Sequence, residues 1–439
     1  MTDEARKVQR TYLVLTLLTT LAASFIWGIN TLFLLDAGLN NTEAFAANAF
    51  FTAGMVIFEI PTGVVADTRG RRLSFLLGAG TLLVSTLLYL LMWQVKADFW
   101  AWAVASILLG LGFTFFSGAT EAWLVDALSA AGFTGHLESV YGRAQSVDGV
   151  AMLLGSVAGG FVAQLTNLGV PYLLRAGMLG VTLAVAFWFM HDQGFTPRKG
   201  ETPLQAVRVV LRGSIDGGLR NAPVRWLMLA APFTAGVGIY AFYAFQPYLL
   251  KLFGDPRAYG IAGLAAALIA GAQIVGGLIV PRVRGFFARR TDAILLSAIF
   301  SVVLMVAIGL TTNFVLALVL IAVWCLGLAI VAPIRGAFIN GLIPSEQRAT
   351  VLSFDSLMGS AGGVVAQPAL GRSADLFGYG PSYVIAGAIQ AIAIPFALLA
   401  RHEHASSDPI DSSLYDAEPV ANVIPEELEA DEPVIGPLA

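Results

Sequence analysis

The sequence predicts an all-α integral membrane protein with twelve transmembrane helices in two pseudo-symmetric six-helix bundles. Three observations carry this prediction: the composition, a series of long apolar segments, and an internal repeat. Of the 439 residues, 57% are hydrophobic and only 12% are charged, whereas a soluble domain carries about 25% charged residues. The chain is therefore expected to lie largely in lipid rather than in water.

Twelve apolar segments follow one another along the chain, and each is close to or above the roughly 20 residues that a helix needs to cross a bilayer. The first is too long for the apolar region of a cleaved signal peptide, so we interpret it as an uncleaved span. The segments cover residues 11–35, 43–66, 73–94, 99–128, 141–167, 170–190, 223–252, 258–282, 292–312, 315–343, 348–377 and 380–400.

The basic residues set the expected orientation in the cell membrane. Of the 25 lysines and arginines, 19 fall in the N-terminus, in alternate loops or at Arg401, and only Lys96, Lys251 and Arg257 lie in the opposite loops. Because positive loops stay on the cytoplasmic side, both termini are predicted to be cytoplasmic.

An internal repeat divides the chain into two halves. Residues 158–164 read AGGFVAQ and residues 361–367 read AGGVVAQ, and each follows an aspartate, Asp148 or Asp355, in the fifth span of its half. A repeat of six spans is an architecture of transporters that bind their substrate between the two halves. We therefore assign an N-terminal bundle to residues 1–190 and a C-terminal bundle to residues 223–400.

The remaining segments are polar. Residues 191–222 form a cytoplasmic linker in which apolar residues recur at helical spacing, which predicts an amphipathic helix on the membrane surface; a solvated linker is the alternative. Residues 401–439 hold ten acidic residues and one basic residue, and this composition is typical of a disordered tail.

The loop between the second and third spans carries the most specific motif. It reads GVVADTRGRR and contains the residues Gly63, Asp67, Arg69, Gly70, Arg71 and Arg72. This stretch resembles the signature loop of the major facilitator superfamily, and the resemblance covers essentially the whole chain. It implies that Gly63 lets spans two and eleven approach closely, and that Asp67 acts on the N-terminus of span eleven to lock the inner gate. A plain stop-transfer charge cluster is the alternative.

Two departures weaken an assignment as a drug:proton antiporter. Span four lacks the arginine found in some family members, and span five has no proline in its glycine-rich stretch, residues 155–160.

We single out five charged residues within the predicted spans. A charge at a helix centre costs about 2.5–3.5 kcal/mol on insertion scales, so each needs a partner, water or a proton. The four acids are candidates for proton coupling and the single base is a candidate gate partner, although all five could instead be structural contacts. They are Glu59, Glu121, Asp148 and Asp355, with Arg335 as the base.

One contact between these charges can be predicted from helix geometry. If Asp67 meets the start of span eleven, Glu59 lies level with Asp355, because the two helices run antiparallel. We expect Glu59 and Asp355 to share a proton when the inner gate is shut.

Polar and aromatic residues mark a candidate substrate cavity. In span four, Gly110, Thr114, Ser117 and Glu121 share one helical stripe, and the family resemblance implies that spans one, four, seven and ten line the cavity. Packing or lipid contact is the alternative role for the aromatic members. The candidates are Asn30, Thr114, Ser117, Phe233, Tyr240, Tyr243 and Gln246.

These features predict a secondary active transporter, with proton-coupled export of a lipophilic molecule as the first hypothesis. Proton-coupled uptake of a small metabolite and a non-transporting receptor are the alternatives. The expected partners are a small-molecule substrate and the lipid bilayer, with no nucleic acid, and the expected state is a monomer. No cofactor or metal is expected, since the proton gradient would supply the energy. No catalytic constellation or nucleotide-binding loop is present in the sequence, so an enzyme is not expected.

Overall fold

The computed structural model describes residues 2–116, 118–197, 205, 207–208, 212–213 and 215–410. In these parts the regular structure is helical and contains no strand, which confirms the predicted all-α class. The α-helices are α1 (Asp3–Trp27), α2 (Asn30–Asp36), α3 (Asn41–Arg69), α4 (Arg71–Val95), α5 (Phe99–Thr114), α6 (Ala119–Ala130), α7 (Leu137–Leu165), α8 (Gly169–Phe189), α10 (Ala222–Phe253), α11 (Tyr259–Arg284), α12 (Arg290–Leu310), α13 (Phe314–Asn340), α14 (Ser345–Phe377), α15 (Tyr379–Ala391) and α16 (Ala393–His402), with a π-helical turn η1 (Ile215–Leu219) before α10.

Eleven helical segments of the described chain are long and apolar enough to cross a membrane. The predicted eleventh span corresponds to α14, which has 33 residues but is too polar to meet the same criterion. Its polar residues take part in contacts that are described below. The twelve predicted spans therefore correspond to eleven apolar segments and one longer, more polar helix.

Three spans expected to be continuous are interrupted. The first ends its long helix at Trp27 and resumes at Asn30. The fourth ends at Thr114 and resumes at Ala119 after Gly118, whose φ of 67° is left-handed. The twelfth bends at Ile392 between α15 and α16. The prediction of one helical stripe from Gly110 to Glu121 is therefore wrong, because the helix does not run unbroken between these residues.

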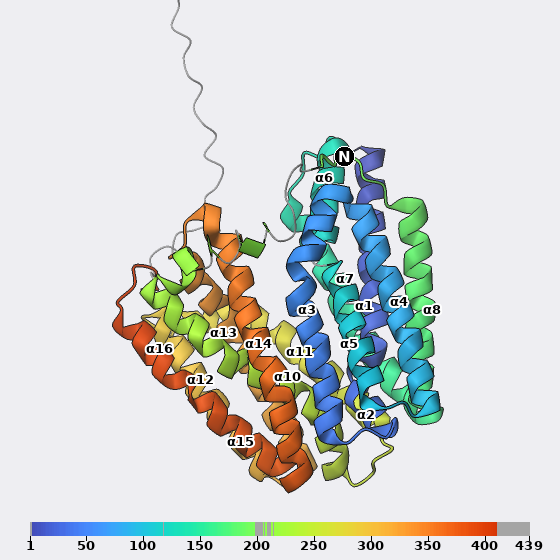
Figure 1. Cartoon of the computed structure of the whole chain (residues 1–439). Helices are drawn as coiled ribbons and strands as arrows, with labels where there is room; N and C mark the ends of the chain where they lie inside the picture. Colours follow the sequence, from blue (N-terminus) through green and yellow to red (C-terminus); the bar gives the residue numbers. More distant parts are fainter. Residues whose placement is uncertain are drawn as a thin grey trace, which may run out of the picture.

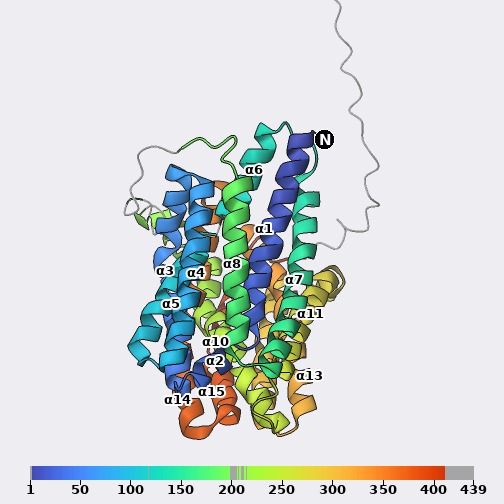
Figure 2. The same cartoon turned by 90° about the vertical axis from the view of Figure 1, so that its right-hand side faces the viewer.

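The helices form two bundles that lie side by side (Figures 1 and 2). In the N-terminal bundle α1 packs on α7 and α8, and α3 and α4 pack on α5; in the C-terminal bundle α10 packs on α14, and α12 packs on α13 and α15. The seam between the bundles is made chiefly by two helix pairs, α3 with α14 and α7 with α11.

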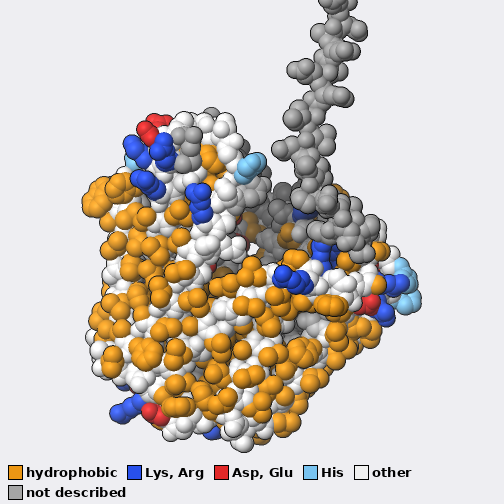
Figure 3. Space-filling model, turned by 180° about the vertical axis from the view of Figure 1, so that it is seen from behind, with side chains coloured by type: hydrophobic (Ala, Val, Ile, Leu, Met, Phe, Trp, Pro, Cys, Tyr) orange, Lys and Arg blue, Asp and Glu red, His pale blue; other side chains and the backbone are white. Residues whose placement is uncertain are grey.

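The exposed surface fits a lipid environment. Figure 3 shows hydrophobic side chains over most of the visible face, with lysines and arginines gathered toward its ends. Exposed residues such as Leu154, Trp188 and Val319 contribute to this apolar surface. We call the end with the N-terminus and the Asp67–Arg72 loop the inner end, after the predicted orientation, and the opposite end the outer end.

The structure corrects the start of the predicted tail. Residues 401–410 are packed rather than disordered: α16 continues to His402, and the Asp408 carboxylate accepts hydrogen bonds from the backbone N–H (2.8 Å) and hydroxyl (2.8 Å) of Thr291. Residues 411–439 lie outside the described residues. So does most of the predicted amphipathic helix in the linker, of which η1 is the longest described part.

Candidate functional site

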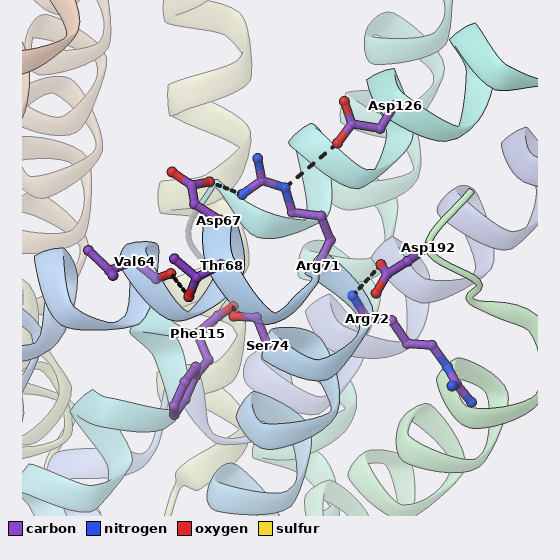
Figure 4. A network of polar contacts seen from close by, with 9 residues as sticks. All are labelled: Val64, Asp67, Thr68, Arg71, Arg72, Ser74, Phe115, Asp126 and Asp192. Atoms are coloured by element: carbon purple, nitrogen blue, oxygen red, sulfur yellow. Dashed lines mark hydrogen bonds and ion pairs between the residues drawn. The ribbon is translucent and has the colours of Figure 1, made fainter. Parts of the chain in front are cut away.

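The signature loop is held within the N-terminal bundle (Figure 4). Asp67 on the last turn of α3 forms an ion pair with Arg71 on the first turn of α4, and the Arg71 Nε lies 3.8 Å from the Asp126 carboxylate on α6. The backbone N–H of Arg72 donates to Asp192 at 2.8 Å. The loop thus joins α3, α4, α6 and the segment after α8.

Gly70 makes this tight turn between two helices possible. Its φ of 115° lies in the left-handed region that favours glycine, and a Cβ at this position would lie 2.3 Å from Asp192 Oδ2. Any side chain would therefore collide with the carboxylate that holds the start of α4.

The inner ends of spans two and eleven are apart in this conformation. A Cβ added at Gly63 would meet nothing within 4 Å, so the close approach expected there is absent. Asp67 pairs with Arg71, and its contact with the start of α14 stays a prediction for the closed inner gate. Figure 3 shows a hollow between the two lobes at this end of the molecule.

The outer end of the same helix pair is closed by Asp375, on the last turn of α14. Its Oδ1 accepts hydrogen bonds from the backbone N–H (3.0 Å) and side-chain amide (2.8 Å) of Asn41. Its Oδ2 accepts from the backbone N–H (2.8 Å) and hydroxyl (2.5 Å) of Thr42. Because the first N–H groups of a helix have no partner within the helix and carry partial positive charge, a carboxylate there is a strong contact. Asp375 thus caps α3 from the other bundle.

A second closure joins the break in the first span to α10. The Gln246 side chain accepts from the Thr31 backbone N–H (2.8 Å) and donates to the Trp27 carbonyl (3.0 Å). The Thr31 hydroxyl donates to the Tyr243 carbonyl at 2.9 Å. That carbonyl lacks its normal helical donor because Pro247, four residues later, has no N–H. The break in the first span and the proline-containing helix α10 therefore satisfy one another's backbone groups across the seam.

The repeated motif supplies a third, pseudo-symmetric closure. Gln164 at the end of AGGFVAQ accepts from the Gly260 N–H of α11 at 2.9 Å, and Gln367 at the end of AGGVVAQ donates to the Thr52 hydroxyl of α3 at 3.2 Å. Both glutamines reach across the seam into the opposite bundle. The repeat thus builds one cross-bundle contact in each helix pair.

The charged residues of the two halves are paired differently. In the C-terminal bundle the Arg335 guanidinium makes a bidentate contact with Asp355, at 2.5 and 2.7 Å, and also donates to the Leu227 carbonyl at 3.1 Å. In the N-terminal bundle Asp148 accepts a hydrogen bond from the neutral Thr20 hydroxyl at 2.5 Å. It forms no ion pair among the described residues.

Glu121 and Asp148 have a common neighbour in the N-terminal bundle, Tyr12 of α1. Glu121 is exposed on α6, and both acids interact electrostatically with the Tyr12 hydroxyl. Spans four and ten are the fourth spans of their halves. Span four provides the acid Glu121, whereas span ten provides the base Arg335. Glu59 lies half-buried on α3, and its sharing of a proton with Asp355 stays a prediction for the closed inner gate, since Asp355 binds Arg335 here.

Several cavity candidates lie inside the packed structure. Thr114 is buried, and its carbonyl accepts from Thr62 of α3 at 3.1 Å. Tyr240 is buried and shares a hydrogen bond of 2.5 Å with Ser382 of α15. Phe233 stacks on Phe396 of α16 with ring centroids 6.2 Å apart. In this conformation Thr114 and Phe233 pack within their own bundles, whereas the Tyr240 ring also packs on Phe45 of α3 across the seam, with ring centroids 4.8 Å apart.

The other cavity candidates lie at or beside the seam, except Ser117. Gln246 and Tyr243 belong to the α10 closure, and Asn30 donates to Asn48 at 2.9 Å and accepts from Tyr172 at 3.0 Å. Ser117 lies outside the described residues. The half-buried ring of Trp27 packs against Phe242 across the seam, with centroids 4.8 Å apart.

Sequence reasoning missed two charged residues within the spans. Asp375 was overlooked as an inter-bundle contact, although Asn40, Asn41, Thr42 and Glu43 carry a helix-start signal that identifies the N-terminus it caps. Arg175 on α8 is buried, donates to the Thr86 hydroxyl (3.1 Å) and the Ala22 carbonyl (3.2 Å), and its guanidinium carbon lies 5.7 Å from the centroid of the Phe113 ring.

Two bundles of long apolar helices that meet along a seam define this chain as a multi-pass membrane protein. A family model described as the Major Facilitator Superfamily matches residues 12–291. The chain belongs to this family, which groups secondary transporters and not enzymes. No curated protein sequence matches the chain.

Solved structures of transporters share its fold at low sequence identity. The nucleoside transporter NupG matches with a TM-score of 0.76 at 9% identity over 89% of this chain and 98% of that one. A D-xylose-proton symporter matches with a TM-score of 0.66 at 15% identity over 90% and 97%. A bacterial homologue of the human lysosomal transporter Spinster matches with a TM-score of 0.68 at 14% identity over 94% and 100%.

Proposed function

We propose that this protein is a proton-coupled transporter that moves a small organic molecule by rocking its two bundles about the central seam. The observation that carries the proposal is a difference between the two ends of the seam: the outer end is held by cross-bundle contacts and the inner end is not closed in the same way. Cross-bundle hydrogen bonds at Asp375, Gln246 and Gln367 hold the outer half together, whereas a Cβ at Gly63 of α3, nearer the inner end, would meet no described atom within 4 Å. The conformation therefore opens to the inner side.

The two ends of the α3–α14 pair supply the alternating gates. Each helix ends with an aspartate, Asp67 or Asp375, that can cap the first turn of the other helix. The 29 residues of α3 separate its two ends by roughly 43 Å at 1.5 Å per residue. A rocking motion that opens the outer end and closes the inner end would exchange the Asp375 contact for the Asp67 contact.

Proton coupling is assigned to the N-terminal bundle. Asp355 forms an ion pair with Arg335, but Asp148 has a neutral donor and shares the neighbour Tyr12 with Glu121. An ionisable residue within the membrane that lacks an opposite charge is a functional site by default. Asp148 and Glu121 are therefore the proposed proton carriers, and Asp355 holds α14 on α13.

The proposed substrate is a lipophilic or drug-like molecule, and the proposed direction is export. Aromatic groups support this choice: Trp27, Phe242 and Tyr243 are half-buried at the seam, where they offer flat apolar surfaces to a ligand that enters from the inner side. A substrate leaving the cytoplasm would enter through the open inner end.

Uptake of a polar metabolite is the second candidate, and a specific observation favours it. The Asn48 side-chain nitrogen and the Gln367 side-chain oxygen are buried without a hydrogen-bond partner within the described structure. A buried donor and acceptor of this kind favour a ligand that carries hydroxyl or amide groups. The similar solved structures include a nucleoside transporter and a sugar symporter.

An accumulation assay separates these functions. Energised cells that express the intact chain, an Asp148→Asn variant or an Asp98→Asn variant are exposed to a mixed panel of lipophilic drugs and polar metabolites. Export is supported if cells with the intact chain accumulate less compound than cells without it, and if a protonophore or Asp148→Asn removes this difference. Uptake is supported if cells with the intact chain accumulate more, and if the same two treatments remove the difference. The exposed outer Asp98 is the matched control. Equal accumulation of every compound in cells with and without the chain would contradict the proposal.

A further inference from the structure

A pocket of about 550 Å³ lies on the outer side of the seam, and nothing in the proposed transport cycle uses it. Its walls come from both bundles, and most of its lining is apolar. The N-terminal bundle contributes α2, and the C-terminal bundle contributes the end of α10, the following loop and the start of α11; the lining residues include Leu32, Leu35, Pro247, Leu250, Lys251 and Arg257. Its volume and apolar walls are typical of sites for small ligands.

Two cations line this pocket. Lys251 and Arg257 are exposed, and neither forms an ion pair within the described parts of the chain. One acid, Asp36, also lines the pocket, where it accepts a hydrogen bond from the Trp93 indole at 2.7 Å, and Asp255 in the following loop accepts one from the Arg257 backbone N–H at 2.9 Å.

We propose that this pocket binds an amphipathic anion, which is a molecule with one anionic head and an apolar chain. The head would lie between Lys251 and Arg257, since charge-assisted hydrogen bonds to a carboxylate or phosphate are stronger than neutral ones. The chain would lie on Leu32, Leu35 and Leu250, which form an apolar wall that water covers poorly. A zwitterionic or uncharged amphiphile lacks the net charge that selects this site.

Binding at this pocket is coupled to the conformation of the protein. Leu32 directly follows Thr31 and Pro247 directly follows Gln246, so the pocket lies immediately outside the closure between the first span and α10. Its two walls separate when the outer end opens. A ligand that needs both walls therefore binds the outer-closed state more tightly and increases the population of that state.

The test uses the full-length protein in nanodiscs of phosphatidylcholine, with dodecanoate as the probe. Calorimetry compares the intact protein with a Lys251→Gln, Arg257→Gln double variant and with Arg372→Gln. Arg372 is an exposed cation near the outer end of α14 that does not line the pocket, so it controls for general charge loss. Matched melting temperatures show that the exposed substitutions leave the fold intact.

The proposal predicts saturable binding to the intact protein and to Arg372→Gln, and at least about 10-fold weaker binding to the double variant. A neutral dodecyl maltoside should not compete. Competition by phosphatidylglycerol in the nanodisc would identify a membrane lipid as the natural source of the anion, and absence of competition would identify a free fatty acid. Equal binding by the double variant, or no saturable binding to the intact protein, would overturn the proposal.

A second readout tests the coupling. A Gly63→Cys substitution in a Cys325→Ser background places a thiol at the open inner end, and dodecanoate should increase its rate of maleimide labelling. The double variant should show no such increase. These measurements need no transport substrate, so their failure is distinct from failure of the proposed function.

Discussion

The Asp375 carboxylate of α14 and Thr42 of α3 bind one another across the two bundles: one carboxylate oxygen accepts from both the backbone N–H and the hydroxyl of Thr42, at 2.8 and 2.5 Å. This contact places a negative charge on the first turn of a helix that belongs to the other half of the protein. It also lies at the opposite end of α3 from Asp67. One helix thus carries a proposed gate contact at each end.

Replacing Asp375 by alanine should loosen the outer gate. Hydrogen bonds to a charged group contribute about 1.5–3 kcal/mol each, so loss of the carboxylate should shift the equilibrium toward the outer-open state by at least about 10-fold. Hydrogen-exchange mass spectrometry should show faster exchange of the Asn41 and Thr42 amides. Asp98→Ala, which removes an outer acid that makes no capping hydrogen bond to its own helix, should leave this exchange unchanged. Unchanged protection in Asp375→Ala would show that the carboxylate does not hold the gate.

Gln246→Leu should destabilise the junction between the first span and α10. The substitution leaves the Thr31 N–H and the Trp27 carbonyl without their partner, and each buried polar group left unpaired costs about 1–3 kcal/mol. We expect a lower melting temperature and a larger outer-open population. Gln246→Glu retains an acceptor for Thr31 but loses the donor to Trp27, so its effect should be intermediate. A Gln246→Leu protein as stable as the parent would contradict this role.

Asp355→Asn should impair folding rather than coupling. It leaves the Arg335 charge without its carboxylate in a mostly buried site, and breaking such a pair costs about 3–5 kcal/mol. Expression and melting temperature should fall. An Arg335→Met, Asp355→Leu double variant should recover much of the lost stability, because it removes both charges together. Wild-type stability of Asp355→Asn would argue against a structural role for the pair.

Asp148→Asn should uncouple transport from the proton gradient while the protein stays folded. The Thr20 hydroxyl can donate to an asparagine oxygen as well as to a carboxylate, so little stability is lost. In proteoliposomes, gradient-driven accumulation should disappear and exchange of substrate between the two sides should continue. Full gradient-driven accumulation by Asp148→Asn would move the assignment to Glu121, for which Glu121→Gln is the matching variant.

The sequence allowed the architecture to be predicted because each contributing signal is local. Apolar length marks the spans, and the GVVADTRGRR stretch marks the turn between α3 and α4. The AGGFVAQ and AGGVVAQ stretches likewise identified helices that meet across the seam. These features follow from residues that are neighbours along the chain.

The contacts across the seam were less accessible to sequence reasoning. Asp375 and Asn41 are more than 300 residues apart, and nothing in either stretch specifies the other as its partner. The break at Gly118 reoriented Glu121 relative to Thr114, which a helical projection of a continuous span could not show. The pairing of Asp355 with Arg335 depends on how α14 packs on α13, and neither stretch of sequence specifies the other as its partner.

The central claim is that the Asp375 and Asp67 contacts alternate between the two ends of one helix pair. Double electron–electron resonance tests it with spin labels at Arg69 and Arg348 for the inner end, and at Lys96 and Leu376 for the outer end. The account predicts opposite changes: Asp375→Ala should lengthen the outer distance and shorten the inner one, and Asp67→Ala should do the reverse. Distances at the two ends that change in the same direction, or independently of one another, would contradict it.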